Sequence, residues 1–217
     1  MIEAVVFDLD GVLIQTEELW DDVREGMAHA AGGRYGADEQ RAMMGMSSPE
    51  WSRYMHEHVG LAESPDAIAA EVVRQMSERY REQLPLIDGA AEAVERLTVR
   101  WPLGVASSSN RELIDLVLES SGLGRYFEAS VSSEEVARGK PAPDVFLEAA
   151  RRLGVGPTSC AAVEDSENGI LAAKAADMRT IAIPNPHYPP HEDALAAADV
   201  VIASIEELTP AIVEGSS

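Results

Sequence analysis

Short apolar runs, separated by longer segments of mixed polarity, recur along the chain. Residues 5–7 (VVF) are β-branched or aromatic, which favours a buried strand. Five further apolar runs are bounded by proline, serine or acidic residues, which commonly mark the ends of strands. We therefore predict strands at 5–7, 103–106, 129–131, 160–165, 180–183 and 199–204.

Between most of these runs the apolar residues follow helical spacing. This spacing predicts helices at 88–97, 113–120, 141–154, 166–177 and 204–213. Asp88 is a potential N-cap of the first, and Ser109 with Glu112 has the spacing of a capping box. Strands that alternate with helices predict an α/β fold, here a doubly wound, Rossmann-like parallel sheet with helices on both faces.

One long segment, residues 16–84, interrupts this alternation. It contains helical patterns at 16–32 and 64–84, with Ser64 as an expected N-cap, and no convincing strand. We predict an inserted all-helical cap domain at 16–84 and a catalytic core built from residues 1–15 and 85–217. The two crossings between them, near Gln15 and near residues 84–87, are expected hinges.

Composition limits the class of protein. The chain has 217 residues, of which 46% are hydrophobic, which suits one large domain or a domain with an insert. A net charge of −21 disfavours binding to nucleic acid or to an anionic membrane surface. No apolar run is long enough for a transmembrane helix, and we expect no signal peptide from the pattern of the first residues. The single cysteine, Cys160, suits a buried thiol in a reducing compartment. We expect a cytoplasmic monomer.

Polar and charged residues gather where the predicted strands end. Asp8 and Asp10 follow the first strand, Ser107 follows the second, and Glu164 and Asp165 end the fourth. Lys140 precedes the helix that leads into the fourth strand. Because ligands of an open parallel sheet bind beyond the carboxyl ends of its strands, we expect these side chains to meet at one edge.

Carboxylates from separate segments converge most readily around a hard divalent cation. We therefore predict a Mg²⁺ site formed by Asp8, Asp10 (through its main-chain carbonyl), Glu164 and Asp165. An ammonium and a hydroxyl beside it suit a phosphoryl group. Asp8 then suits the nucleophile of an aspartyl-phosphate pathway, and Asp10 the general acid and base.

These segments resemble the motifs of the haloacid dehalogenase-like superfamily of phosphotransferases. "FDLDGVL" (7–13), "GVASSSN" (104–110), "RGKPAPD" (138–144) and "VEDSENG" (163–169) look like its first to fourth motifs. The resemblance implies that Asp8, Asp10 and Lys140 are catalytic and that Mg²⁺ is the cofactor. It also implies a small helical cap and a set of phosphate-binding residues, namely Ser107, Ser108, Asn110 and Lys140.

These motifs predict a phosphatase that acts on a small phosphorylated metabolite, such as a sugar phosphate. A β-phosphoglucomutase-like mutase is the alternative, but Ser48 and Trp20 stand where the resemblance would require arginine and histidine. A phospho-acceptor signalling module is disfavoured by the helical insert. A true haloacid dehalogenase is disfavoured by Asp10 and the Glu164–Asp165 pair.

Substrate choice is expected to reside in the cap. The candidate specificity residues are Trp20, Gly45, Met46, Ser47 and Ser48. Their loop is neutral and the cap contains no lysine, which suggests a small monophosphate rich in hydroxyls. His187 and His191, in a proline-rich segment, are expected in a solvated loop rather than at a metal.

Overall fold

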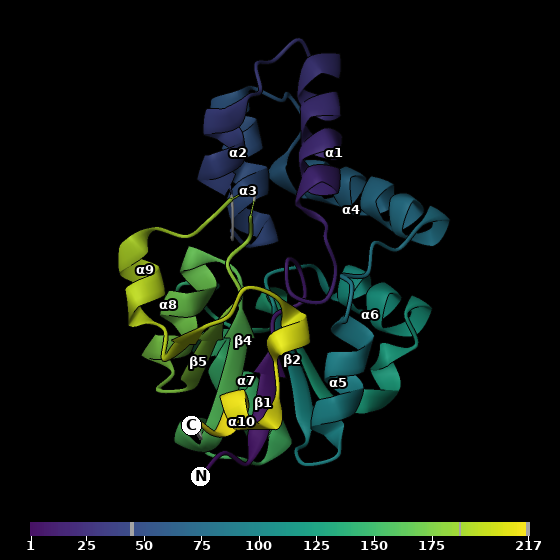
Figure 1. Cartoon of the computed structure of the whole chain (residues 1–217). Coiled ribbons are helices and arrows are strands. Elements are labelled where there is room, and N and C mark those ends of the chain that lie inside the picture. The colour runs from purple at the N-terminus through teal and green to yellow at the C-terminus, as the bar shows by residue number, and fades with distance from the viewer. Residues whose placement is uncertain (44–45, 187, 216–217) are drawn as a thin grey trace.

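The predicted α/β sheet is present in the computed structural model, which describes residues 1–43, 46–186 and 188–215. Its strands are all parallel and lie in the order β3-β2-β1-β4-β5-β6. Their bounds are Ala4–Phe7 for β1, Leu103–Ser107 for β2, Phe127–Ser132 for β3, Cys160–Glu164 for β4, Arg179–Ala182 for β5 and Val200–Val201 for β6. The doubly wound fold class is therefore confirmed, and β1 lies at the centre of the sheet (Figure 1).

Alternate residues of β1 face two separate hydrophobic clusters. Val5 and Phe7 belong to one cluster, with the apolar faces of α5 and α6, whereas Ala4 and Val6 belong to the other, with α7 and α8. The helices that complete the sheet domain are α5 (Ala90–Thr98), α6 (Arg111–Ser120), α7 (Asp144–Leu153), α8 (Glu167–Ala175), α9 (Glu192–Ala197) and α10 (Pro210–Glu214). Burial of both faces of β1 explains why this strand is a continuous apolar run.

A helical segment follows β1 and lies above the carboxyl edge of the sheet (Figure 1). It comprises α1 (Glu17–Ala30), α2 (Ala37–Met43), α3 (Ser48–Tyr54), a π-helical turn (Met55–Val59) and α4 (Pro65–Glu82). Trp51, Met55 and Ile68 are almost completely buried within it. None of the described helices is long and apolar enough to cross a membrane.

The two chain crossings between the helical segment and the sheet are hydrogen-bonded to each other. The Gln15 amide donates to the Pro85 carbonyl at 2.8 Å, and the Ile87 amide donates to the Leu13 carbonyl at 3.0 Å. Ile14 and Leu86 form an antiparallel bridge between these bonds. The division into domains at 16–84, and its hinges, stay predictions.

Several local predictions are confirmed and others need correction. The Ser64 hydroxyl accepts from the Ala67 amide, as expected of an N-cap. However, α5 is preceded by Gly89 in the left-handed region (φ +82°) rather than capped by Asp88. The predicted helix at 204–213 is divided, because Pro210 has no amide hydrogen to continue an earlier turn and instead begins α10.

Cys160 lies in β4 and is fully buried. Burial raises the pKa of its thiol to about 11, and the nearby Glu3 adds to this shift. The prediction of a buried thiol is therefore confirmed. The raised pKa also means that the reactive thiolate form is disfavoured at neutral pH.

Candidate active site

A buried ammonium joins the ends of two central strands. Lys140 Nζ lies 2.6 Å from Asp8 Oδ1 and 2.5 Å from Glu164 Oε1. Asp8 follows β1, and its amide donates to the Val163 carbonyl of β4 at 2.9 Å, so the sheet ladder fixes its backbone. All three charged side chains are buried: Asp8 is 6% exposed, Lys140 4% and Glu164 0%.

The negative charge of this cluster exceeds what Lys140 neutralises. Burial raises the pKa of Asp8 well above its usual value, against the attraction of Lys140. Burial likewise raises the pKa of Asp165, and repulsion from Glu164 and Asp8 adds to the shift. Burial opposes the charge on Lys140, but Asp8 and Glu164 outweigh it and raise the pKa of the ammonium. One cation therefore faces three carboxylates, and a further positive charge is needed to keep them ionised together.

The chemistry of the donor set fits Mg²⁺. One carboxylate oxygen from each of Asp8, Glu164 and Asp165 lies within 4.8 Å of the other two. Gly11, at φ +79°, brings the backbone so close that a Cβ there would be 1.9 Å from Asp165 Oδ2. Hard oxygen donors in a tight, buried group are the ligands that Mg²⁺ prefers. One Glu164 oxygen is held by Lys140, and the other accepts from the Asp165 and Ser166 amides.

Asp10 is oriented by hydroxyl groups from two parts of the chain. Thr16 Oγ1 donates to Asp10 Oδ1 at 2.5 Å. Ser109 Oγ donates to Asp10 Oδ2 at 2.6 Å, and Ser107 Oγ approaches the same oxygen at 3.4 Å. The expected capping role of Ser109 is therefore wrong. Asn110 is the N-cap residue of α6, and the Ser109 hydroxyl faces the carboxylate instead.

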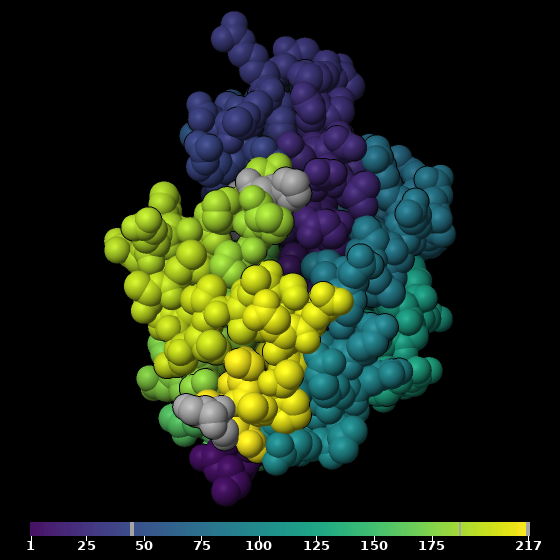
Figure 2. Space-filling model, viewed as in Figure 1, coloured from purple at the N-terminus to yellow at the C-terminus, as the bar shows by residue number. Residues whose placement is uncertain are grey.

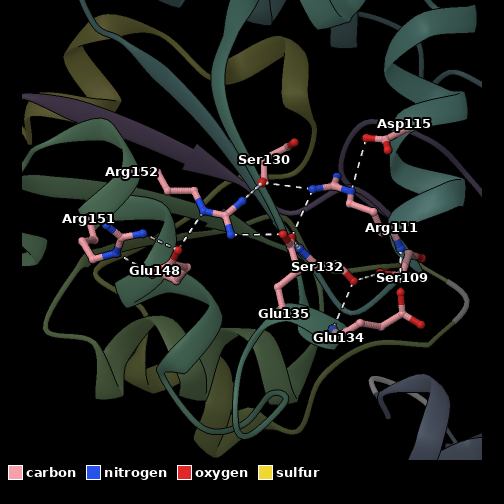
Figure 3. Close-up of polar contacts among 10 residues, drawn as sticks. All are labelled: Ser109, Arg111, Asp115, Ser130, Ser132, Glu134, Glu135, Glu148, Arg151 and Arg152. Atoms are coloured by element: carbon pink, nitrogen blue, oxygen red, sulfur yellow. Dashed lines mark hydrogen bonds and ion pairs between the residues drawn. The ribbon is translucent and has the colours of Figure 1, made fainter.

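The loop that carries these serines is braced by β3 and the turn after it (Figure 3). Ser132 Oγ donates to the Ser109 carbonyl at 2.7 Å, and the Arg111 amide donates to Glu134 Oε2 at 2.9 Å. Glu135 pairs with both Arg111 and Arg152, at 3.2 and 3.1 Å. This network holds the Ser107–Asn110 turn in place, and Ser109 connects it to the Asp10 carboxylate.

The predicted phosphate-binding residues do not all face the same space. Ser108 lines the cavity that contains Asp8 and Asp10. Ser107 is completely buried, and its hydroxyl accepts from the Ser109 amide at 3.0 Å. The Asn110 side chain turns away, donating to Glu134 at 2.6 Å and accepting from Ser48 Oγ at 2.7 Å.

The predicted cap residues divide in the same way. Trp20 and Met46 line the cavity. Ser47 caps α3 by bonding Glu50, while Ser48 is buried against Asn110, so neither is among the described lining residues. Gly45 lies outside the described residues. The cavity is thus walled by α1 and α2 more than by the predicted loop.

Sequence reasoning missed several residues that close this cavity. Glu17 on α1 accepts from Asn185 Nδ2 at 2.7 Å, and the side-chain amide of Gln40 on α2 donates to the Tyr188 hydroxyl. Both contacts join the helical segment to the loop after β5, which reaches it on the face shown in Figure 2. Arg24 also lines the cavity. Its spacing of four residues from Trp20 was the available signal, because such residues share a helix face.

This combination of fold, buried lysine and acidic cluster can be compared with known proteins. The family model for haloacid dehalogenase-like hydrolases matches residues 2–177. The chain belongs to that family. It is 34% identical over 214 residues to hexitol phosphatase B of Escherichia coli strain K12, covering 96% of this chain and 95% of the relative.

Two further comparisons agree with this assignment. Fructose-1-phosphate phosphatase YqaB of Escherichia coli strain K12 is 36% identical over 188 residues, covering 82% of this chain and 94% of the relative. The crystal structure of CbbY from Rhodobacter sphaeroides in complex with phosphate superposes with a TM-score of 0.87 at 27% identity. It covers 99% of this chain and 100% of its own. The predicted family resemblance is confirmed, and the chain is a hydrolase of this family.

Proposed function

We propose that this chain is a Mg²⁺-dependent phosphatase that hydrolyses a small phosphate monoester, a sugar phosphate, through a phosphorylated Asp8. The observation that carries the proposal is the contact of Asp8 with Lys140, beside the acidic pair of Glu164 and Asp165. Similarity over nearly the whole chain to proteins named as sugar-phosphate and hexitol phosphatases supports the substrate class.

In this mechanism the Asp8 carboxylate attacks phosphorus, and the bond from phosphorus to the leaving oxygen breaks. Asp10 gives its proton to that oxygen, then takes a proton from the water that hydrolyses phospho-Asp8. Thr16 and Ser109 orient Asp10 for both transfers. Lys140 holds Asp8 and offsets charge at the phosphoryl group. Mg²⁺, held by Asp8, Asp165 and Glu164, would neutralise negative charge on that group.

The test is phosphate release from a panel of phosphate esters, with Mg²⁺ and with EDTA. We expect activity only with the metal. Asp8→Asn should lower kcat by at least about 1,000-fold, as loss of a nucleophile does. Asp10→Asn should lower it by about 100-fold or more. Asp88→Asn, an exposed aspartate outside the cavity, is the matched control. Full activity in Asp8→Asn would refute the mechanism.

The mutase alternative is less well supported. Trp20 and Ser48 occupy the cap positions where histidine and arginine would be expected, and Ser48 is buried against Asn110. Incubation of β-glucose 1-phosphate with a bisphosphate primer separates the two functions. A phosphatase releases free phosphate, whereas a mutase forms glucose 6-phosphate first.

A further inference from the structure

One cation lies in the cavity wall formed by α1. Among the described residues that line the cavity, Arg24 is the only lysine or arginine. It lies two helical turns beyond Thr16, the residue that contacts Asp10. At 1.5 Å per residue the two backbones are about 12 Å apart along α1. The Arg24 backbone therefore lies beyond the reacting end of the cavity, whereas its guanidinium is close enough for the charge of Asp10 to act on it.

Two tryptophans hold the Arg24 side chain. Its guanidinium carbon lies 4.8 Å from the ring centroid of Trp20 and 4.9 Å from that of Trp51. The two rings pack edge to face, with centroids 6.0 Å apart. A guanidinium fixed in this way loses little further side-chain entropy when it binds a ligand.

The charge of Arg24 has no carboxylate in direct contact within the described part of the chain. No ion pair to it within 4.0 Å is found there, and its buried Nε lacks a hydrogen-bond acceptor. Burial lowers the pKa of Arg24, whereas Tyr35 and Asp21 support the charged form. Asp21 itself accepts from the Tyr35 hydroxyl at 2.7 Å. An acceptor in the cavity would satisfy the guanidinium more fully.

The other charged residues of the lining are acidic, and their positions matter here. Asp8, Asp10 and Asp165 lie at the reacting end, where Lys140 and the metal would offset them. Glu17 and Asp21 lie on α1, and the charge of Asp21 acts on Arg24 without an ion pair between them. An anionic group at the remote end would meet repulsion unless a cation were placed there. We propose that Arg24 is a specificity-determining residue that binds a second anionic group of the substrate, a carboxylate or a phosphate, remote from the phosphoryl group that is cleaved.

This inference rests on the proposed function, and it revises the expectation of a substrate with a neutral remote end. Three substrates with the same six-carbon chain test it: glucitol 6-phosphate, 6-phosphogluconate and glucitol 1,6-bisphosphate. They differ at carbon 1, which carries a neutral hydroxyl in the first, forms a carboxylate in the second and carries a phosphate in the third. We expect the native enzyme to have a kcat/KM at least 10-fold higher for one of the two substrates with an anionic carbon 1, and that substrate identifies the group.

Variants then assign the preference to Arg24. Arg24→Gln should lower kcat/KM for the preferred substrate by about 10- to 100-fold, mainly through KM, as loss of a charged hydrogen bond does. Its effect on glucitol 6-phosphate should be at least tenfold smaller, and Arg24→Lys should restore part of the loss. Arg53→Gln, an exposed arginine of α3, is the control. Equal losses on charged and neutral substrates would show that Arg24 only packs the cap, and would overturn the inference.

Binding without turnover separates this inference from the proposed function. In an Asp8→Asn background, calorimetry should show tighter binding of 6-phosphogluconate or the bisphosphate than of glucitol 6-phosphate. Adding Arg24→Gln should remove that difference. If the native enzyme hydrolyses none of the three substrates but this preference persists, the proposed function fails on these esters and the Arg24 subsite stands. Equal affinities for all three ligands would overturn the subsite.

Discussion

At the residue scale, Thr16 links the helical segment to the proposed acid and base. Its hydroxyl is completely buried and donates to Asp10 Oδ1 at 2.5 Å. We predict that Thr16→Val, which keeps the shape and removes the donor, lowers kcat about tenfold because Asp10 is less well oriented. Steady-state kinetics would measure the loss of kcat. Urea unfolding would check that the variant loses only about 1 kcal/mol of stability.

The matched control is Thr98→Val, at the end of α5. Thr98 Oγ1 donates to the Glu95 carbonyl at 3.0 Å, in a helix end outside the cavity. This variant should retain the native kcat. An unchanged kcat in Thr16→Val would show that Ser109 alone suffices to orient Asp10.

Residues at strand ends could be predicted, whereas residues on the cap face of the site could not. Asp8 and Lys140 follow from position, because a parallel sheet gathers the carboxyl ends of its strands. Arg24 and Thr16 belong to a helix, and the pattern of that helix says which face is apolar but not which surface it meets. The four-residue spacing of Arg24 from Trp20 indicates a shared helix face. The surface that this face meets depends on how the cap is placed over the sheet, which no local signal encodes. Ser109 was misassigned because a capping serine and a serine that bonds a carboxylate have the same sequence signature.

At the scale of elements, helix α8 packs directly against the end of β4. A Cβ built on Gly169 would lie 1.8 Å from Glu164 Oε1, the atom that accepts from Lys140. We predict that Gly169→Ala destabilises the fold by about 1–3 kcal/mol through this overlap, and lowers activity by displacing the carboxylate. Equilibrium unfolding in urea, with kinetics on the same samples, would measure both effects.

Gly26 provides the control for helix propensity. It lies on the exposed face of α1, and a Cβ there would meet nothing within 4 Å. Gly26→Ala should therefore stabilise the protein by about 0.5–1 kcal/mol. If both variants gained stability, the close approach of α8 to Glu164 would not be a constraint on the site.

The elements themselves were predictable where pattern and packing agree. All six strands lie where apolar runs indicated them: β1, β2 and β4 are buried along their whole length, and β3, β5 and β6 in part. The segment 204–213 departed from prediction because its helical spacing spans Pro210, and a proline without an amide hydrogen starts a helix more readily than it continues one. The backbone chemistry of Pro210 thus determined where the helix begins, against the helical spacing of residues 204–213.

At the scale of the whole molecule, hydrogen bonds join the helical segment to the sheet domain around the cavity. Three described contacts are Glu17 to Asn185, Ser48 to Asn110 and Gln40 to Tyr188. Each connects segments far apart in sequence, and each would break if the helical segment rotated about the paired crossings at Gln15 and Pro85. They therefore favour the closed arrangement over an open one.

Tyr188→Phe tests this role. Loss of the hydroxyl removes the contact with Gln40, and a bond of about 1 kcal/mol shifts an open–closed equilibrium about fivefold. We predict a several-fold rise in KM and faster hydrogen exchange in α2, with global stability almost unchanged. Tyr126→Phe is the control, because its hydroxyl bonds Glu95 within the sheet domain, away from the cavity.

A direct contact between Tyr188 and substrate would also raise KM, so a double-mutant cycle must separate the two causes. Gln40→Leu removes the same bond from the α2 side. If the contact acts by holding the cap closed, each single variant and the double variant should show the same rise in KM and the same exchange in α2. Independent, multiplicative effects would instead indicate that Gln40 and Tyr188 each contact the substrate, and closure would then depend on the contacts made by Glu17 and Ser48.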